Sequence, residues 1–112
     1  MASPCDPLGC DEFFRGGFAR RKAGSYRGRG LDRTAARMLA FLQERGTAGA
    51  SVLEIGGGVG EIQLELLRAG AARAVNLELS PAYEAEAAGL VREAGFEGRV
   101  TRRLHDIAVA GD

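Results

Sequence analysis

The sequence predicts an α/β protein in which helices cover a parallel β-sheet in three layers. After residue 31, short apolar segments alternate with helix-length amphipathic segments, in the order helix, then β-α-β-α-β. A glycine-rich run at 56–60 directly follows the first predicted strand. Aromatic residues make up only 6% of the chain, whereas glycine and alanine are frequent, which suits close packing of helices on a sheet. Strands that alternate with helices of this length pair in parallel through right-handed crossovers.

A helix and a strand are predicted before the glycine run. Asp32 is suited to cap a helix that ends at Gly46. The apolar residues of this helix recur at helical spacing: Ala35, Met38, Leu39 and Leu42. The segment 51–55, S-V-L-E-I, is too short for a helix and is apolar, so it is predicted as the first strand.

Two more helices and two more strands are predicted after the glycine run. The segment E-I-Q-L-E-L-L-R-A predicts a helix with Gly70 at its C-terminal end, and residues 73–79 predict the second strand. Ser80 and Pro81 are typical of a helix start, and this helix is expected to stop at Gly95. The segment R-V-T-R-R-L then predicts a third strand.

The chain divides into a basic, Gly/Arg-rich N-terminal arm at residues 1–30 and an α/β domain at residues 31–112. The formal net charge is zero, but residues 1–37 hold eight basic residues against four acidic ones. Such a basic segment can contact nucleic acid or an anionic substrate, or it can be a solvated helical face. Few aromatic residues lie among the arginines, so nucleic acid is not the expected partner. The arm contains a short helix-compatible stretch at 11–21 and no long periodic pattern.

Several classes of protein are disfavoured by what the sequence lacks. No apolar stretch approaches the roughly 20 residues of a membrane span, and the N-terminus lacks the basic and apolar blocks of a signal peptide. A soluble, cytoplasmic protein is therefore expected. Cys5 and Cys10 form one C-x4-C pair without a second pair, and the only histidine is His105. These residues are expected to be reduced thiols and not a metal site.

Three features of the chain fall at the carboxyl ends of the predicted strands, where open α/β sheets bind ligands. They are the glycine run, Glu78 and Asp106. A phosphate-binding P-loop needs a lysine after its glycines, and no lysine follows Lys22. The dinucleotide pattern G-x-G-x-x-G would need a third glycine where Glu61 stands, a negative charge at the helix start that pyrophosphate would occupy. NAD, FAD and nucleoside triphosphates are therefore disfavoured.

The remaining pattern, E-x-G-x-G-x-G, is formed by Glu54, Gly56, Gly58 and Gly60. It resembles motif I of the class I S-adenosylmethionine-dependent methyltransferases. The resemblance continues to an acidic residue about twenty positions on, in V-N-L-E-L-S, and to the aspartate of L-H-D-I. It covers residues 31–112 approximately. The arm, with Y-R-x-R-G-L-D, resembles that of bacterial methyltransferase-domain proteins likened to magnesium-protoporphyrin O-methyltransferase.

The resemblance implies a cofactor and a role for each matched residue. S-adenosylmethionine is a sulfonium cation without phosphate, so carboxylates suit it better than lysines do. Glu78 would accept hydrogen bonds from both ribose hydroxyls, and Leu79 would offer an apolar face to the adenine. Asp106 would accept from the exocyclic amine, and the backbone N–H of Ile107 would reach a ring nitrogen. The glycines would let the backbone approach the methionyl part, and Glu54 would attract its ammonium.

Other roles for the same residues stay open. Glu54 could be satisfied by loop N–H groups, Glu78 could be a surface residue at a strand end, and Asp106 could cap the following turn. His105 could be a surface or interface residue or, less simply, a catalytic one. In the arm, three residues could either meet the carboxylate of the cofactor or serve packing and solvent: Tyr26, Arg27 and Arg29.

The resemblance also implies a Rossmann-like sheet of seven strands, of which these residues supply the first three. The chain is thus expected to be the truncated, N-terminal, cofactor-binding half of a methyltransferase. The residues that bind the methyl acceptor would follow the third strand, so neither the acceptor nor a catalytic residue is assigned. A non-catalytic module for nucleotide binding or protein association is the alternative. In either case the strand at 51–55 would have an open edge, which either promotes self-association or is covered by the arm.

Overall fold

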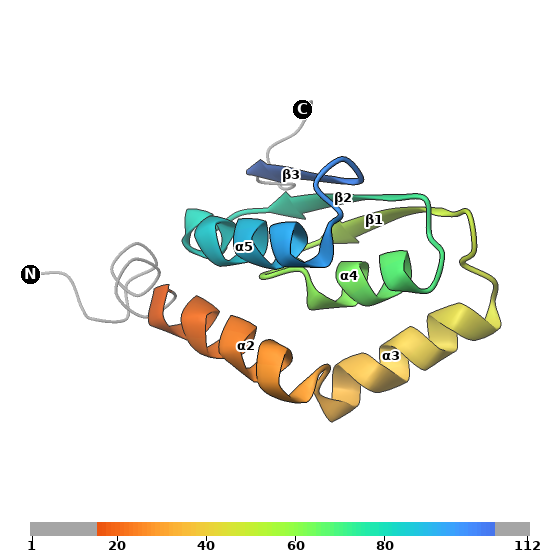
Figure 1. Cartoon of the computed structure of the whole chain (residues 1–112), viewed down its shortest axis with the longest axis horizontal. Coiled ribbons are helices and arrows are strands. Elements are labelled where there is room, and N and C mark those ends of the chain that lie inside the picture. The colour runs from red at the N-terminus through yellow and green to blue at the C-terminus, as the bar shows by residue number, and fades with distance from the viewer. Residues whose placement is uncertain (1–15, 105–112) are drawn as a thin grey trace, which may run out of the picture.

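The structure of the protein is a computed structural model that describes residues 16–104 and confirms the predicted alternation of helices and strands (Figure 1). The elements are α2 (Gly16–Arg29), α3 (Arg33–Glu44), β1 (Ser51–Ile55), α4 (Glu61–Arg68), β2 (Arg73–Glu78), the 3-10 helix η2 (Pro81–Tyr83), α5 (Glu84–Ala94) and β3 (Val100–Leu104). Five residues singled out in the sequence lie outside the described range: Cys5, Cys10, His105, Asp106 and Ile107.

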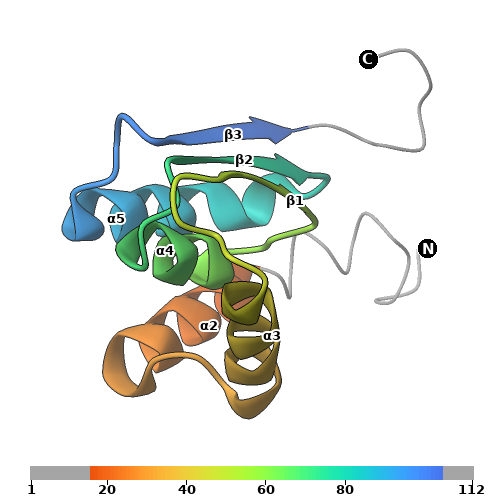
Figure 2. The ribbon, with the colours of Figure 1, turned by 90° about the vertical axis from the view of Figure 1, so that its right-hand side faces the viewer.

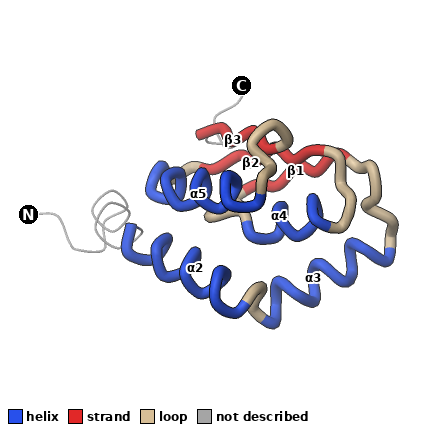
Figure 3. The backbone as a smooth tube through the Cα atoms, in the orientation of Figure 1, coloured by secondary structure: helices blue, strands red, loops and turns tan. Residues whose placement is uncertain are grey.

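The three strands form one parallel sheet in the order β1-β2-β3. Both crossovers move in the same direction across the sheet, and right-handed crossovers of this kind place their helices on the same face. Accordingly α4 and α5 lie together against one face, and α2 and α3 form a further layer beyond them (Figures 1 and 2). Figure 3 shows the same separation, with the strands gathered on one side of the helices. Helices on the opposite face, which a three-layer arrangement implies, are not among residues 16–104.

This one-sided covering gives the strands an alternating pattern of burial. In β2, Ala74, Asn76 and Glu78 are buried and face the helices. In β1, Leu53 is 63% exposed and Ile55 57% exposed, because both point to the face that carries no helix in the described part of the chain. β1 is also an edge of the described sheet, as the sequence predicted.

Two clusters of apolar side chains hold the layers together, the first between helices and the second between helices and the sheet. One lies between α2, α4 and α5, and contains Ala19, Ala23, Tyr26, Val59, Leu64 and Leu90. The other lies between α3, α4 and the sheet, and contains Leu66, Leu67, Ala71 and Ala74. Many of these residues are small, which allows the close helix-on-sheet packing that the composition predicted.

Helix α2 is longer than the sequence analysis predicted for the arm. The helix-compatible stretch was expected at 11–21, whereas the described helix continues to Arg29. Its buried residues are Ala19, Ala23 and Tyr26, which lie four and three positions apart and so share one face. That face packs against α5 and η2, and tertiary packing therefore outweighs the poor helix propensity of the glycines in this segment.

Local signals for the other helices are confirmed. The side chain of Asp32 accepts a hydrogen bond from the backbone N–H of Ala35 at 2.8 Å, as expected of an N-cap. Ser80 similarly accepts from the N–H of Ala82 at 3.3 Å. The segment after Ser80 begins as η2 and becomes α-helical only at Glu84, where the prediction had one continuous helix.

Candidate functional site

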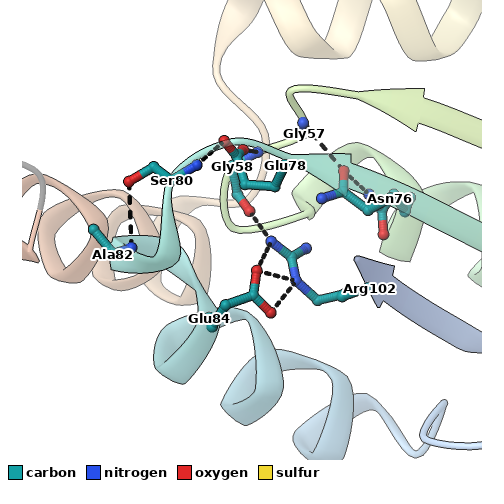
Figure 4. A network of polar contacts seen from close by, with 9 residues as sticks. Gly57, Gly58, Asn76, Glu78, Ser80, Ala82, Glu84 and Arg102 are labelled. Atoms are coloured by element: carbon teal, nitrogen blue, oxygen red, sulfur yellow. Dashed lines mark hydrogen bonds and ion pairs between the residues drawn. The ribbon is translucent and has the colours of Figure 1, made fainter. Parts of the chain in front are cut away.

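The candidate site is the loop at 56–60, which runs from the end of β1 to the start of α4 beside the end of β2 (Figure 4). The N–H of Gly56 donates to the carbonyl of Leu77 at 2.7 Å and so continues the pairing of β1 with β2. The N–H of Gly58 donates to the carboxylate of Glu78 at 2.9 Å. The structure thus brings together the glycine pattern and the acidic residue of the second strand, as the sequence predicted.

Gly57, which the sequence motif leaves as a variable position, is the most confined residue of the loop. A Cβ atom at this position would lie 2.1 Å from Asn76 Oδ1 and 2.9 Å from both Gln63 Nε2 and Glu54 Cδ. The N–H of Gly57 donates to the same Asn76 oxygen at 3.1 Å. The loop therefore needs glycine here because its backbone lies directly on buried side chains.

Gly60 caps α4 in the left-handed conformation, with φ of 85°, and glycine adopts this conformation without steric cost. The next residue, Glu61, opens the helix, and burial raises the pKa of its carboxyl group above the usual value. A carboxyl group therefore stands at the helix N-terminus, where a phosphate would otherwise bind. The structure thus confirms that Glu61 stands at the helix start, the position from which the sequence disfavoured phosphate ligands.

Glu78 is only 5% exposed, so the alternative of a surface residue at a strand end is wrong. Its second oxygen accepts the N–H of Ser80 at 3.1 Å. Each carboxylate oxygen thus accepts one backbone N–H, and each can accept a further donor. Leu79, the next residue, is 60% exposed and presents an apolar side chain just beyond the strand.

Glu54 carries a buried oxygen, Oε1, that has no hydrogen-bond partner. Loop N–H groups therefore do not satisfy this oxygen, although the sequence left that alternative open. Burial raises the pKa of Glu54, while Gln63 and the positive charge of Arg102 act in the opposite direction. An unpartnered buried acceptor is costly unless a donor reaches it, so this oxygen is a candidate contact for a ligand cation.

A buried polar cluster beneath the loop was not predicted from the sequence. Asn76 Oδ1 accepts both the Gly57 N–H and the side-chain amide of Gln63, the latter at 2.8 Å. Arg102 Nη2 donates to the carbonyl of Gly58 at 2.6 Å and pairs with Glu84 at 3.1 Å. The signal in the sequence was a polar residue in the interior of an apolar strand, Asn76 in V-N-L.

Helix α2 contributes to the site through residues other than those singled out in the sequence. Tyr26 donates its hydroxyl to Glu65, and Arg27 pairs with Glu93 at 2.8 Å, so both hold α2 to neighbouring helices. Phe18 and Lys22 instead reach the loop. With Tyr83 and loop residues they line a cavity of about 180 Å³. Of the two roles that the sequence left open for Tyr26 and Arg27, these contacts agree with helix packing and not with a ligand contact.

Neither a metal-binding cluster nor a membrane-spanning helix is found among residues 16–104. These residues contain no group of three or more His, Cys, Asp or Glu side chains placed to hold a metal ion. None of the helices they form is both long enough and apolar enough to cross a membrane.

No protein-family model matches the sequence, and no curated protein matches it. Solved structures do match the fold. One is an S-adenosylmethionine-dependent methyltransferase from Thiobacillus denitrificans in complex with S-adenosyl-L-homocysteine, with 28% identity and a TM-score of 0.59 over 70% of this chain. Another is an RNA methyltransferase from Salinibacter ruber in complex with the same compound, with 26% identity and a TM-score of 0.60 over 71% of this chain.

A structure from Methanococcus maripaludis matches 97% of this chain with a TM-score of 0.70, and at 15% identity it shows the fold alone. The chain spans 31% of the Thiobacillus protein, 51% of the Salinibacter protein and 47% of the Methanococcus protein. The resemblance to S-adenosylmethionine-dependent methyltransferases is therefore confirmed, with a Rossmann-like α/β fold that corresponds to part of those proteins.

Proposed function

We propose that this chain binds S-adenosyl-L-methionine and supplies the cofactor-binding part of a methyltransferase. The observation that carries the proposal is a pair of carboxylates, Glu54 and Glu78, beside a loop in which four of the five residues are glycine. Such a site offers acceptors to a cation and to hydroxyl groups, and the lysine beside it, Lys22, is already paired with Asp32. Structural neighbours that hold S-adenosyl-L-homocysteine support the same cofactor.

The residues present fit the chemical groups of this cofactor. The remaining lone pairs of Glu78 suit the two hydroxyls of a ribose, in charge-assisted hydrogen bonds. The exposed side chain of Leu79 suits one face of the adenine. The unpartnered oxygen of Glu54 suits an ammonium group. Asp106 and Ile107 stay proposed contacts to the adenine, two and three residues after the end of β3, where Leu104 pairs with Glu78.

The bound cofactor would supply a methyl group carried on a positively charged sulfur. The residues of this chain would hold and orient the cofactor, so that a methyl acceptor can approach in line with the sulfonium. Gly56 and Gly58, with φ of 70° and 60°, would keep that approach free of side chains. The acceptor and any residue that removes its proton are not assigned to the described residues.

Protein association is the second candidate function. It is favoured by the apolar side chains of β1 on the uncovered face of the sheet, Leu53 and Ile55. A module of this kind would use the half-fold as a surface and would not need the loop carboxylates.

Calorimetric titration of the chain with S-adenosyl-L-homocysteine tests the first proposal. One-site binding is expected, and circular dichroism would establish that the sample is folded. A folded chain that does not bind the compound at millimolar concentration would contradict the proposed cofactor and leave protein association as the better account.

A further inference from the structure

Arg102 is an unusual residue for the interior of a strand. It lies in the middle of β3, opposite Asn76 of β2, and its side chain is only 9% exposed on the face that the helices cover. Arginine is seldom buried unless it is paired, because removing its charge from water is costly. The hydrogen-bond partners of the Arg102 guanidinium therefore indicate the role of this residue.

The guanidinium joins two parts of the candidate site (Figure 4). Nε donates to both oxygens of Glu84 at 3.2 and 3.1 Å, and Nη2 donates to one of them at 3.1 Å. Glu84 is the first residue of α5 and lies beside η2. Nη2 also donates to the carbonyl of Gly58 at 2.6 Å. The carboxylate thus fixes the orientation of the guanidinium, and the guanidinium fixes the loop carbonyl.

Gly58 is consequently held on both sides. Its N–H is bound by Glu78, and its carbonyl is bound by Arg102. These two groups belong to the two successive peptide units that flank the residue, so both units have a defined orientation. Without such contacts a glycine with φ of 60° could readily adopt other conformations, because it has no side chain to restrict it.

We propose that Arg102 is a positioning residue of the cofactor site. Through the carbonyl of Gly58, it holds the glycine loop in the conformation that binds the cofactor. The inference rests on the proposed function, because the affected ligand is S-adenosylmethionine or its product. A loop that is already ordered loses less conformational freedom when the ligand binds, so the protein binds the ligand with higher affinity. A loop that samples several conformations would bind in proportion to the competent fraction.

A second feature places Arg102 close to the ligand-contacting groups. Its Nη1 is buried and without a partner, as are Asn76 Nδ2 and Glu54 Oε1. A Cβ atom at Gly60 would lie 3.3 Å from this Nη1, so the guanidinium lies beside the second half of the loop, from Gly58 to Gly60. Arg102 does not line the cavity at the loop, so it acts on the site through the backbone of Gly58.

Arg99 offers a matched control. It stands three residues earlier, next to the start of β3, and it also binds backbone carbonyl groups with its guanidinium, those of Ala71 and Ala72, while it lies over the ring of Phe96. Because the strands are parallel, these contacts are at the end of the sheet opposite to the glycine loop. Both Arg99→Met and Arg102→Met remove hydrogen bonds from a guanidinium to backbone carbonyl groups, and Arg102→Met also removes the ion pair with Glu84. Only Arg102→Met changes a contact of the site.

The experiment compares the full chain with Arg102→Met, Arg102→Lys and Arg99→Met. Calorimetry measures affinity for S-adenosyl-L-homocysteine, and amide hydrogen exchange by NMR follows Gly58. Arg102→Met is expected to weaken binding about tenfold, or roughly 1.4 kcal/mol, and to speed exchange at Gly58. Arg102→Lys, which keeps one charged donor, is expected to recover part of both effects. Arg99→Met is expected to lower thermal stability while affinity changes less than about twofold.

Equal losses of affinity in Arg102→Met and Arg99→Met would overturn the inference and indicate a structural role only. If Arg102→Met does not fold, Glu84→Gln takes its place, since it removes the charge that orients the guanidinium. An unchanged affinity and exchange rate in that variant would also overturn the inference. If the unaltered chain does not bind the compound, the proposed function fails, and exchange at Gly58 alone then decides whether Arg102 positions the loop.

Discussion

The carboxylate of Glu78 accepts the N–H of Gly58 at 2.9 Å and so joins the end of β2 to the loop that follows β1. The same carboxylate is proposed to accept the ribose hydroxyls. Glu78→Ala is therefore expected to weaken binding of S-adenosylmethionine at least about tenfold, because each charge-assisted hydrogen bond contributes roughly 1.5–3 kcal/mol. Calorimetry measures the change.

Glu44→Ala is the control for this substitution, because Glu44 is an exposed carboxylate at the end of α3. Its affinity for the cofactor is expected to equal that of the unaltered chain. An unchanged affinity in a folded Glu78→Ala variant would show that the ribose is not bound at this strand end.

Ligand selectivity follows from the charges at the loop. Glu61 stands at the N-terminus of α4, and the chain's one lysine, Lys22, is paired with Asp32 at 3.1 Å and lies 4.0 Å from Glu61. A phosphate bound there would lie beside the carboxyl group of Glu61, and the ammonium group of Lys22 would already be paired with a carboxylate. In a thermal-shift series, S-adenosylmethionine and S-adenosylhomocysteine are expected to raise Tm more than ATP or NAD. Greater stabilisation by ATP or NAD would contradict the methyltransferase assignment.

The close contact at Gly57 predicts a loss of stability on substitution. Gly57→Ala would force a methyl group against Asn76 and Gln63, and overpacking of this kind costs about 1–3 kcal/mol. Gly24→Ala is the control, since a Cβ atom at that position of α2 has open space around it. This control is expected to gain up to about 1 kcal/mol from helix propensity. Urea denaturation of both variants measures the difference, and equal stabilities would contradict the close contact.

The sequence predicted the parts of the fold that depend on local signals. The strand at 51–55 was predicted with its observed bounds, because a short apolar segment between turn residues has few alternatives. Helix α2 was largely missed, since its periodicity consists of Ala19, Ala23 and Tyr26 among glycines and arginines. This segment is stabilised as a helix by its tertiary contacts with α5 and η2, which the sequence pattern does not reveal.

The candidate site could be predicted to a similar extent. The motif placed Glu54 and Glu78 beside the glycine loop, because strand order and motif spacing determine that edge of the sheet. Arg102 and Gln63 could not be placed there, because their contacts depend on side-chain direction across three elements. The confinement of Gly57 likewise follows from Asn76, which lies nineteen residues later.

Glu54 gives a prediction for pH dependence. Burial raises its pKa in the folded protein above the ordinary 4.5, so the protonated form is favoured on folding. The contribution of Glu54 to stability is therefore fully present below pH 4.5 and is lost as pH rises through the folded-state pKa. Glu54→Gln, which remains neutral, is expected to have a higher Tm than the unaltered chain at pH 7–8, with the difference shrinking towards pH 4.5.

Thermal unfolding across this pH range measures the effect. The same variant is expected to bind S-adenosylmethionine more weakly, because the amide replaces the carboxylate that is proposed to meet the ammonium. A Tm difference that stays constant with pH would show that folding does not raise the pKa of Glu54.

Among the described residues, nothing pairs with the edge of β1 and no helix covers its outer face, so these 112 residues are expected to self-associate. Unpaired backbone groups along an edge strand recruit other strands, and the exposed Leu53 and Ile55 add apolar area beside that edge. The arm was one candidate to cover the edge, but its described helix packs on α5 and η2.

Light scattering is expected to report dimers or larger species, and Leu53→Lys is expected to shift them towards monomer. Met38→Lys, at a 50% exposed position of α3, is the control and is expected to leave the association unchanged. A monomer at all concentrations, or equal effects of the two lysines, would show that β1 is not the surface of association.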